Sequence, residues 1–214
     1  SFEISRGEHV AVIGDNGTGK STFLKLLLGE EAGAGRVKFG PTVKWAYLPQ
    51  IIHFAHPERT LLDTMLYEKN CTVQTARDRL GAYLFEGEDV FKTVGSLSGG
   101  EQSRLRLCML MDEKINLLVL DEPTSFLDIR YKLELLTILK TMVREKNLAV
   151  LMSLHELDLA DRVSDTVVCV SGDRIDRIGT PKEIFTSDYI AKLYHMEPGR
   201  YDPCFDTLDY VPKA

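Results

Sequence analysis

The stretch GDNGTGKS, residues 14–21, places glycines, a lysine and a hydroxyl at a spacing that suits phosphate binding. It fits the pattern G-x-x-x-x-G-K-[ST], in which the glycines let backbone N–H groups turn toward an anion. Lys20 can reach the outer phosphates of a nucleotide, and the Ser21 hydroxyl can ligate Mg²⁺. The alternative is a Gly-rich turn that only begins a helix. The candidate phosphate-site residues are Gly14, Asp15, Asn16, Gly17, Thr18, Gly19, Lys20, Ser21 and Thr22.

Two adjacent carboxylates, Asp121 and Glu122, directly follow the aliphatic run at 117–120. In phosphate-binding sheets, ligands lie at the carboxyl edge of the strands, where such residues project. Successive side chains of an extended chain point to opposite sides. We therefore expect Asp121 to ligate Mg²⁺ and Glu122 to act as a general base on the attacking water. Two charges at an exposed strand end are the alternative.

The elements that must position these side chains alternate between strand and helix. An apolar run without alternation, such as 117–120, suits a parallel strand that is covered on both faces. The pattern predicts an α/β fold with a mostly parallel sheet flanked by helices. Strands are predicted at 2–5, 10–13, 37–39, 43–48, 117–120, 149–153, 166–170 and 174–178. Helices are predicted at 21–28, within 60–91, and at 98–111, 130–145, 156–163, 181–185 and 188–195.

We interpret the whole chain, residues 1–214, as one domain with a helical lobe inserted at about 55–112 and an irregular tail at about 197–214. Trp45 and Tyr47 alternate in a predicted strand and are interpreted as packing residues. The net charge is −6 and no block of basic residues occurs, so no direct DNA binding is expected. No apolar run is long enough for a membrane span, and the four widely spaced cysteines suggest a reduced, cytoplasmic protein.

Six motifs together resemble the ATP-binding cassette (ABC) ATPases, which have a P-loop NTPase core. These are GDNGTGKST, Gln50 after KWAYLP, LSGGEQ at 97–102, LLVLDEP, SFLD, and His155 in MSLHELDLA. The resemblance makes Gln50 a contact of Mg²⁺ and water, Glu122 the general base and His155 a contact of the γ-phosphate. It assigns nucleotide contacts to the signature motif and to the loop at 125–128, through Ser98, Gly99, Gly100, Glu101 and Asp128.

The family resemblance also implies a head-to-tail dimer, of two copies or of this chain with another ABC domain, that encloses two ATP molecules. The helix N-terminus at Ser98 is a second anion site that supports this arrangement. Closure would exclude water and complete the catalytic site. The family places an adenine-stacking aromatic residue further upstream of Lys20 than the printed sequence reaches.

The two halves resemble different branches of the family. Up to about Asp121 the sequence is similar to the ABC-F proteins, which act on ribosomes, and after it to ATPase subunits of iron-siderophore and cobalamin importers. Three functions therefore stay open. The first is the energy-coupling ATPase of a membrane transporter, held by a permease at the inner face of the membrane. The second is an ABC-F-like ribosome-associated translation or antibiotic-resistance factor, and the third a truncated or chimeric ATP-binding module that hydrolyses poorly.

Overall fold

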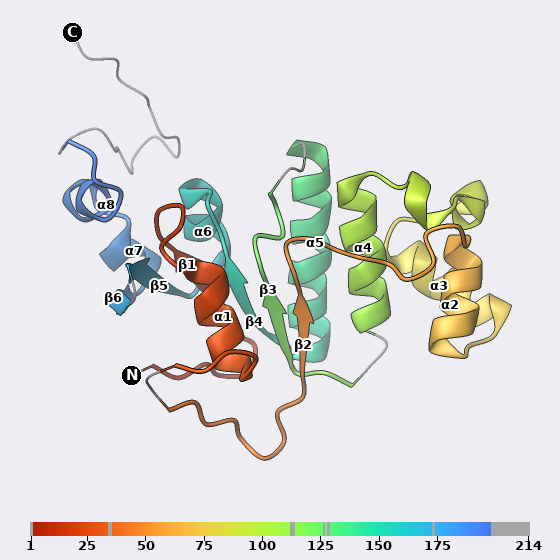
Figure 1. The fold of residues 1–214 in the computed structure, drawn as a ribbon, viewed down its shortest axis with the longest axis horizontal. Coiled ribbons are helices and arrows are strands. Elements are labelled where there is room, and N and C mark those ends of the chain that lie inside the picture. Colours follow the sequence, from red (N-terminus) through yellow and green to blue (C-terminus); the bar gives the residue numbers. More distant parts are fainter. Residues whose placement is uncertain are drawn as a thin grey trace, which may run out of the picture.

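A six-stranded sheet forms the centre of the molecule (Figure 1). The computed structural model describes residues 2–33, 36–111, 114–125, 127, 129–172 and 174–197. The strands are β1 (His9–Ile13), β2 (Trp45–Leu48), β3 (Leu117–Leu120), β4 (Ala149–Ser153), β5 (Thr166–Ser171) and β6 (Arg174–Gly179). Their order is β2-β3-β4-β1-β5-β6, and every neighbouring pair is parallel except β5 and β6. The predicted mostly parallel sheet is confirmed.

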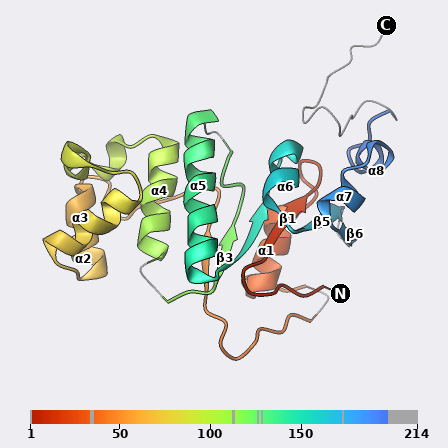
Figure 2. The same ribbon diagram turned by 180° about the vertical axis from the view of Figure 1, so that it is seen from behind.

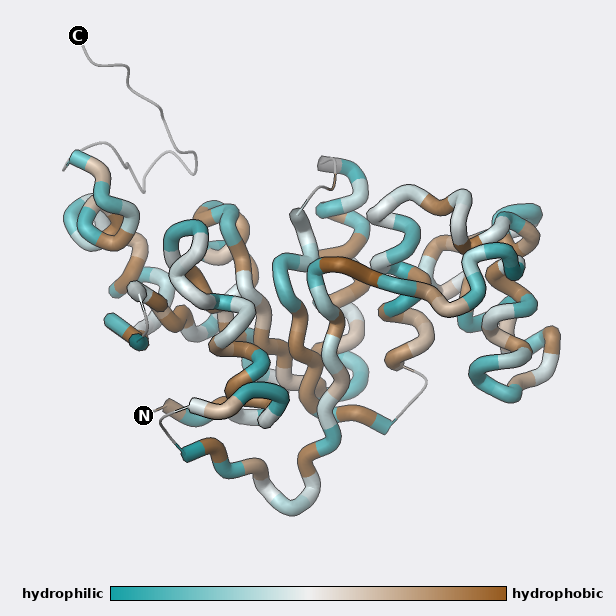
Figure 3. The backbone as a smooth tube through the Cα atoms, in the orientation of Figure 1, coloured by the Kyte–Doolittle hydropathy of each residue, from teal (hydrophilic) through white to brown (hydrophobic). Residues whose placement is uncertain are grey.

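Helices cover both faces of this sheet. They are α1 (Lys20–Leu28), α2 (Leu61–Lys69), α3 (Val73–Ala82), α4 (Gly99–Leu110), α5 (Ile129–Lys146), α6 (Leu157–Val163), α7 (Pro181–Ile184) and α8 (Ser187–Leu193). On one face, Leu24 of α1 packs with Val10 and Val12 of β1. The alternate residues Ala11 and Ile13 belong to the cluster formed with α5 and α6, which lie in front when the molecule is seen from behind (Figure 2). The hydrophobic segments accordingly gather at the central strands (Figure 3).

The helices α2, α3 and α4 lie together at one end of the molecule, beyond the edge strand β2 (Figure 1). Thr60 and Thr72 begin α2 and α3 as N-caps, because each hydroxyl accepts a hydrogen bond from a backbone N–H of the first turn. Two short 3₁₀ helices, Gly87–Phe91 and Val94–Ser96, connect α3 to α4. This part of the chain therefore carries α4, and with it the LSGGEQ motif, away from the phosphate loop.

Two of the predicted strands are wrong. Residues 2–5 and 37–39 are extended segments without ladder partners in the described part of the chain. Phe2 packs its ring near Phe23 of α1, with centroids 6.3 Å apart, instead of entering the sheet. Val37 and Phe39 remain substantially exposed, and β2 begins only at Trp45. An apolar alternation forms a strand only where a neighbouring backbone can pair with it.

The carboxyl ends of four parallel strands meet at one edge of the sheet. β1 leads into the glycine loop, β2 into Gln50, β3 into Asp121 and β4 into the loop that holds His155. This edge therefore brings together the residues that the sequence singled out. None of the described helices has the length and apolar character that crossing a membrane requires.

Candidate active site

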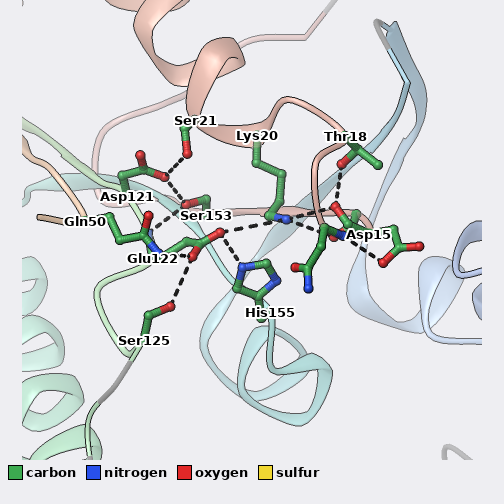
Figure 4. A network of polar contacts seen from close by, with 12 residues as sticks. Asp15, Thr18, Lys20, Ser21, Gln50, Asp121, Glu122, Ser125, Ser153 and His155 are labelled. Carbon is green, nitrogen blue, oxygen red and sulfur yellow. Dashed lines mark hydrogen bonds and ion pairs between the residues drawn. The ribbon is translucent and has the colours of Figure 1, made fainter.

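The carboxylate of Glu122 is the centre of a network of polar contacts (Figure 4). Gln50 Nε2 donates a hydrogen bond of 2.6 Å to Glu122 Oε2, and Ser125 Oγ donates one of 3.1 Å to the same oxygen. His155 Nε2 contacts Glu122 Oε1, and Lys20 Nζ lies 3.9 Å from it. The structure thus joins Glu122, Gln50 and His155, which the sequence had predicted as catalytic residues from three separate segments.

The left-handed backbone of Glu122, and not the alternation of side chains along a strand, separates the Glu122 side chain from that of Asp121. The φ of Glu122 is +47°, so the backbone turns into the left-handed region directly after Asp121. Such a conformation costs a non-glycine residue about 1–2 kcal/mol. The Glu122 N–H is held by a 2.8 Å hydrogen bond to Ser153 Oγ. Strain of this kind persists only where the surrounding contacts fix it, and it is common at functional sites.

The Asp121 carboxylate is almost completely buried and receives three hydroxyl hydrogen bonds. Ser21 Oγ donates to Asp121 Oδ1 over 3.0 Å, and Ser153 Oγ donates to the same oxygen over 2.7 Å. Tyr47 donates to Oδ2 over 3.2 Å. Ser21 and Asp121, two of the three residues predicted to hold Mg²⁺, are therefore adjacent. Gln50 lies against Glu122 instead of Asp121.

Tyr47 and Ser153 are site residues that the sequence reasoning missed. The strand alternation predicts a packing role for Tyr47, but its hydroxyl reaches Asp121. Burial raises the pKa of the Tyr47 phenol, and the negative charge of Asp121 raises it further, so the phenol keeps its proton as a donor. Ser153 could have been recognised as the polar residue that ends an apolar strand, two positions before His155.

The glycine loop folds around the side chain of Lys20. Lys20 Nζ donates to the backbone oxygens of Gly14, at 3.0 Å, and Asp15, at 3.2 Å. Burial lowers the pKa of the Lys20 ammonium, while the charges of Glu122 and Asp121 oppose that change. At Gly14 the loop passes so close to β5 that an added Cβ would lie 2.3 Å from the Val170 backbone oxygen. The positive charge is thus held at the N-terminus of α1, where anions are stabilised.

A pocket of about 540 Å³ opens beside these groups. Tyr194, which follows α8, is a lining residue that the sequence did not predict. Burial raises the pKa of the Tyr194 phenol. The backbone N–H of Gly14 lies near the phenol oxygen and lowers this pKa, although the two groups do not form a hydrogen bond. The C-terminal helices therefore reach the phosphate loop. The lining residues are Asp15, Asn16, Gln50, Glu122, Ser125, His155 and Tyr194.

The predicted signature residues lie elsewhere. Ser98 caps α4, with its side chain accepting from the Glu101 N–H and its own N–H donating to Glu101 Oε2 over 2.8 Å. None of the four described residues Ser98, Gly99, Gly100 and Glu101 lines the pocket. Within one chain the signature motif and the glycine loop are therefore separate. Asp128 lies outside the described residues.

The oxygen atoms at this site suit a magnesium ion. Among the described residues, no group of three or more His, Cys, Asp or Glu side chains could hold a metal alone. Mg²⁺ is commonly held by one or two carboxylates together with substrate phosphates instead of an all-protein cage. Asp121 and Ser21, beside the phosphate loop, provide this type of partial site.

Comparisons with known proteins agree with this geometry. The ABC transporter family model matches residues 1–125. The zinc import ATP-binding protein ZnuC of Paracoccus denitrificans is 34% identical, over 92% of this chain and 77% of ZnuC. The ATP-binding protein Uup of Escherichia coli is also 34% identical, over 83% of this chain but only 28% of Uup. The dimeric ATP-binding cassette MJ0796, in a post-hydrolysis state bound to ADP and Pi, has the same fold, with a TM-score of 0.67 and 18% identity over 84% of this chain and 88% of that one. The chain belongs to the ABC transporter family and is an ABC-type ATPase.

Proposed function

We propose that this site binds MgATP and that Glu122 is the general base of its hydrolysis. The observation that carries the proposal is the position of the Glu122 carboxylate, which Lys20, Gln50, Ser125 and His155 surround at the mouth of the pocket. The loop at 14–22 provides backbone N–H groups and Lys20 for the phosphates. We assign the site to a single nucleotide-binding domain with a helical lobe.

The proposed reaction is the transfer of the γ-phosphoryl group to water. The water oxygen forms a bond to the γ-phosphorus, the bond to the β–γ bridging oxygen breaks, and Glu122 accepts the proton of the water. Gln50 and His155 hold the base and the water in line, with His155 also near the γ-phosphate. Ser21, Asp121 and Gln50 would hold Mg²⁺, which neutralises charge on the phosphates when it is bound.

The separation of the signature motif from the glycine loop supports a head-to-tail dimer. The capped N-terminus of α4 presents backbone N–H groups to which an anion can bind. Since Ser98 to Glu101 do not line their own pocket, the nucleotide they contact would belong to a second copy or to another ABC domain. We assign Asp128 to the same set of nucleotide contacts from the family resemblance alone. Hydrolysis would then require closure of the dimer.

We propose a membrane permease as the driven partner, with the ATPase bound at the cytoplasmic face. Large apolar side chains are exposed after β2 and on the helical lobe, where a partner protein could cover them. Ile51 is 67% exposed and Tyr67 73%. The likeness to the zinc import ATP-binding protein ZnuC, which spans most of both chains, also supports a transporter.

Replacing Glu122 with Gln tests the chemical proposal. The amide cannot accept the proton of the attacking water, so we expect ATP binding with loss of most turnover and accumulation of an ATP-bound dimer. Phosphate release and size-exclusion chromatography with ATP measure these effects. Glu68→Gln is the matched control, because Glu68 is an exposed residue of α2. Turnover of Glu122→Gln at the parent rate would show that another group is the base.

The likeness to Uup supports an ABC-F-like ribosome factor as the second candidate. The chain spans only 28% of Uup, so a protein of that length has room for a second cassette. Sedimentation of the protein with ribosomes instead of membranes would favour this candidate over a transporter. A parent protein that binds ATP without measurable turnover would instead identify a poorly hydrolysing module.

A further inference from the structure

The side chain of Glu156, directly after His155, contacts two other elements instead of capping its own helix. Glu156 occupies the N-cap position of α6, but its side chain makes no capping hydrogen bond. Ser, Thr, Asp and Asn are the usual residues there. Its carboxylate instead reaches two other elements. Thr124 Oγ1 donates to Glu156 Oε2 over 2.8 Å, and Lys132 Nζ donates to Oε1 over 2.5 Å.

The first contact fixes the turn that carries Glu122. Thr124 is only 1% exposed and lies two residues after Glu122. In the same turn, the Ser125 N–H donates to the Glu122 backbone oxygen over 3.0 Å, and Ser125 Oγ holds the Glu122 carboxylate. A carboxylate from the loop of His155 thus anchors the segment in which Glu122 has its left-handed backbone.

The second contact joins the same loop to α5. Lys132 lies in the first turn of α5, where the helix dipole disfavours a positive charge. Glu156 supplies the opposing negative charge, and both side chains are about a quarter exposed. Burial would raise the pKa of the Glu156 carboxyl, but the hydrogen bonds from Lys132 and Thr124 outweigh it and lower the pKa. The Glu156 carboxyl of this Glu156–Lys132 bridge is therefore ionised at neutral pH.

We propose that Glu156 is a positioning residue that locks the loop of His155 to the turn of Glu122 and to the start of α5. The inference rests on the proposed function, since it concerns the mutual placement of the proposed base and the proposed γ-phosphate contact. Glu156 does not line the pocket, so it acts through these two residues. A misplacement of about 1 Å at a catalytic group can reduce the rate about 100-fold. Because the loop at 14–22 provides most of the proposed phosphate contacts, the bridge affects turnover much more than ATP affinity.

The test uses the full chain with Glu156→Ala, which removes both contacts, and Glu156→Gln, which keeps an acceptor for Thr124 but loses the charge opposite Lys132. We expect kcat to fall on the order of tenfold in Glu156→Ala and less in Glu156→Gln, with the Kd for ATP within about twofold of the parent. Lys132→Met should lower kcat as well, and adding it to Glu156→Ala should cause little further loss. Asp158→Asn, an exposed carboxylate in the same helix turn, should match the parent.

Glu122→Gln is measured alongside these variants to separate the two proposals. If Glu122→Gln loses turnover while Glu156→Ala keeps the parent kcat, the positioning role is wrong and the proposed function stands. The positioning role is also wrong if the Glu156 variants lose ATP affinity and thermal stability together without a lower kcat at saturating ATP. If Glu122→Gln hydrolyses ATP at the parent rate, both proposals are wrong.

Discussion

Replacement of glycine by alanine should destabilise the protein at Gly14 and Gly17 but stabilise it at Gly81. At Gly14, the new Cβ would lie 2.3 Å from the Val170 backbone oxygen, about 1 Å inside an ordinary carbon–oxygen contact. The pairing of β1 with β5 prevents the two backbones from separating freely. We therefore expect Gly14→Ala to lower the free energy of unfolding by about 3 kcal/mol, at the upper end of the usual range for overpacking.

The other two glycines are controls that undergo the same chemical change. At Gly17 an added Cβ meets nothing within 4 Å, but φ is +76°, so Gly17→Ala should cost about 1 kcal/mol. Gly81 lies inside α3, also with open space around it, and Gly81→Ala should stabilise by about 0.5–1 kcal/mol. Urea unfolding followed by circular dichroism gives all three values. A Gly14→Ala variant within 1 kcal/mol of the parent, or a destabilised Gly81→Ala variant, would refute this packing argument.

Three further predictions concern hydrogen bonds and buried phenols. Tyr47→Phe leaves Oδ2 of the buried Asp121 without its donor and should lower the free energy of unfolding by about 1–2 kcal/mol; an unchanged urea midpoint would contradict this. Ser98→Ala removes the cap of α4 and should cost about 1 kcal/mol, visible as a lower thermal midpoint, whereas Ser98→Asp should largely restore it. Above pH 10 the unfolded chain ionises tyrosines that the folded chain keeps protonated, because burial raises their pKa. Unfolding should therefore become easier by at most about 1.4 kcal/mol per pH unit for each such residue, and a flat stability profile between pH 10 and 11 would exclude the effect. These residues are Tyr47, Tyr83, Tyr189 and Tyr194.

Features that depend on neighbouring residues in the chain were predictable from the sequence. The apolar run before Asp121 is the strand β3, because an uninterrupted aliphatic segment is stable only when both faces are covered. The glycine loop lies between β1 and α1 as its pattern requires. Gly29 ends α1 in the left-handed conformation, as expected for a glycine after the last apolar residue.

Features that depend on lateral packing were not predictable. The strand alternation of Trp45 and Tyr47 does not indicate that β2 lies beside β3, in the register that brings the Tyr47 hydroxyl to Asp121. The left-handed turn at Glu122 also has no local signal, since it is supported by Ser153 from β4. The segments 2–5 and 37–39 have strand-like residues, but a strand requires a paired backbone that their sequences cannot specify.

The site is assembled from residues that are far apart along the chain. The hydrogen bonds Gln50–Glu122, Tyr47–Asp121 and Ser21–Asp121 join positions separated by 72, 74 and 100 residues. Contacts of such long range require large loops to close and generally form slowly in folding. A partly folded chain therefore has no complete nucleotide site, and nucleotide binds only the native state. At a concentration 100 times its Kd, such a ligand adds about 2.7 kcal/mol to the stability of the native state. The nucleotide that the protein consumes thus also stabilises correctly folded copies against proteolysis, by a free energy that rises with the logarithm of its concentration.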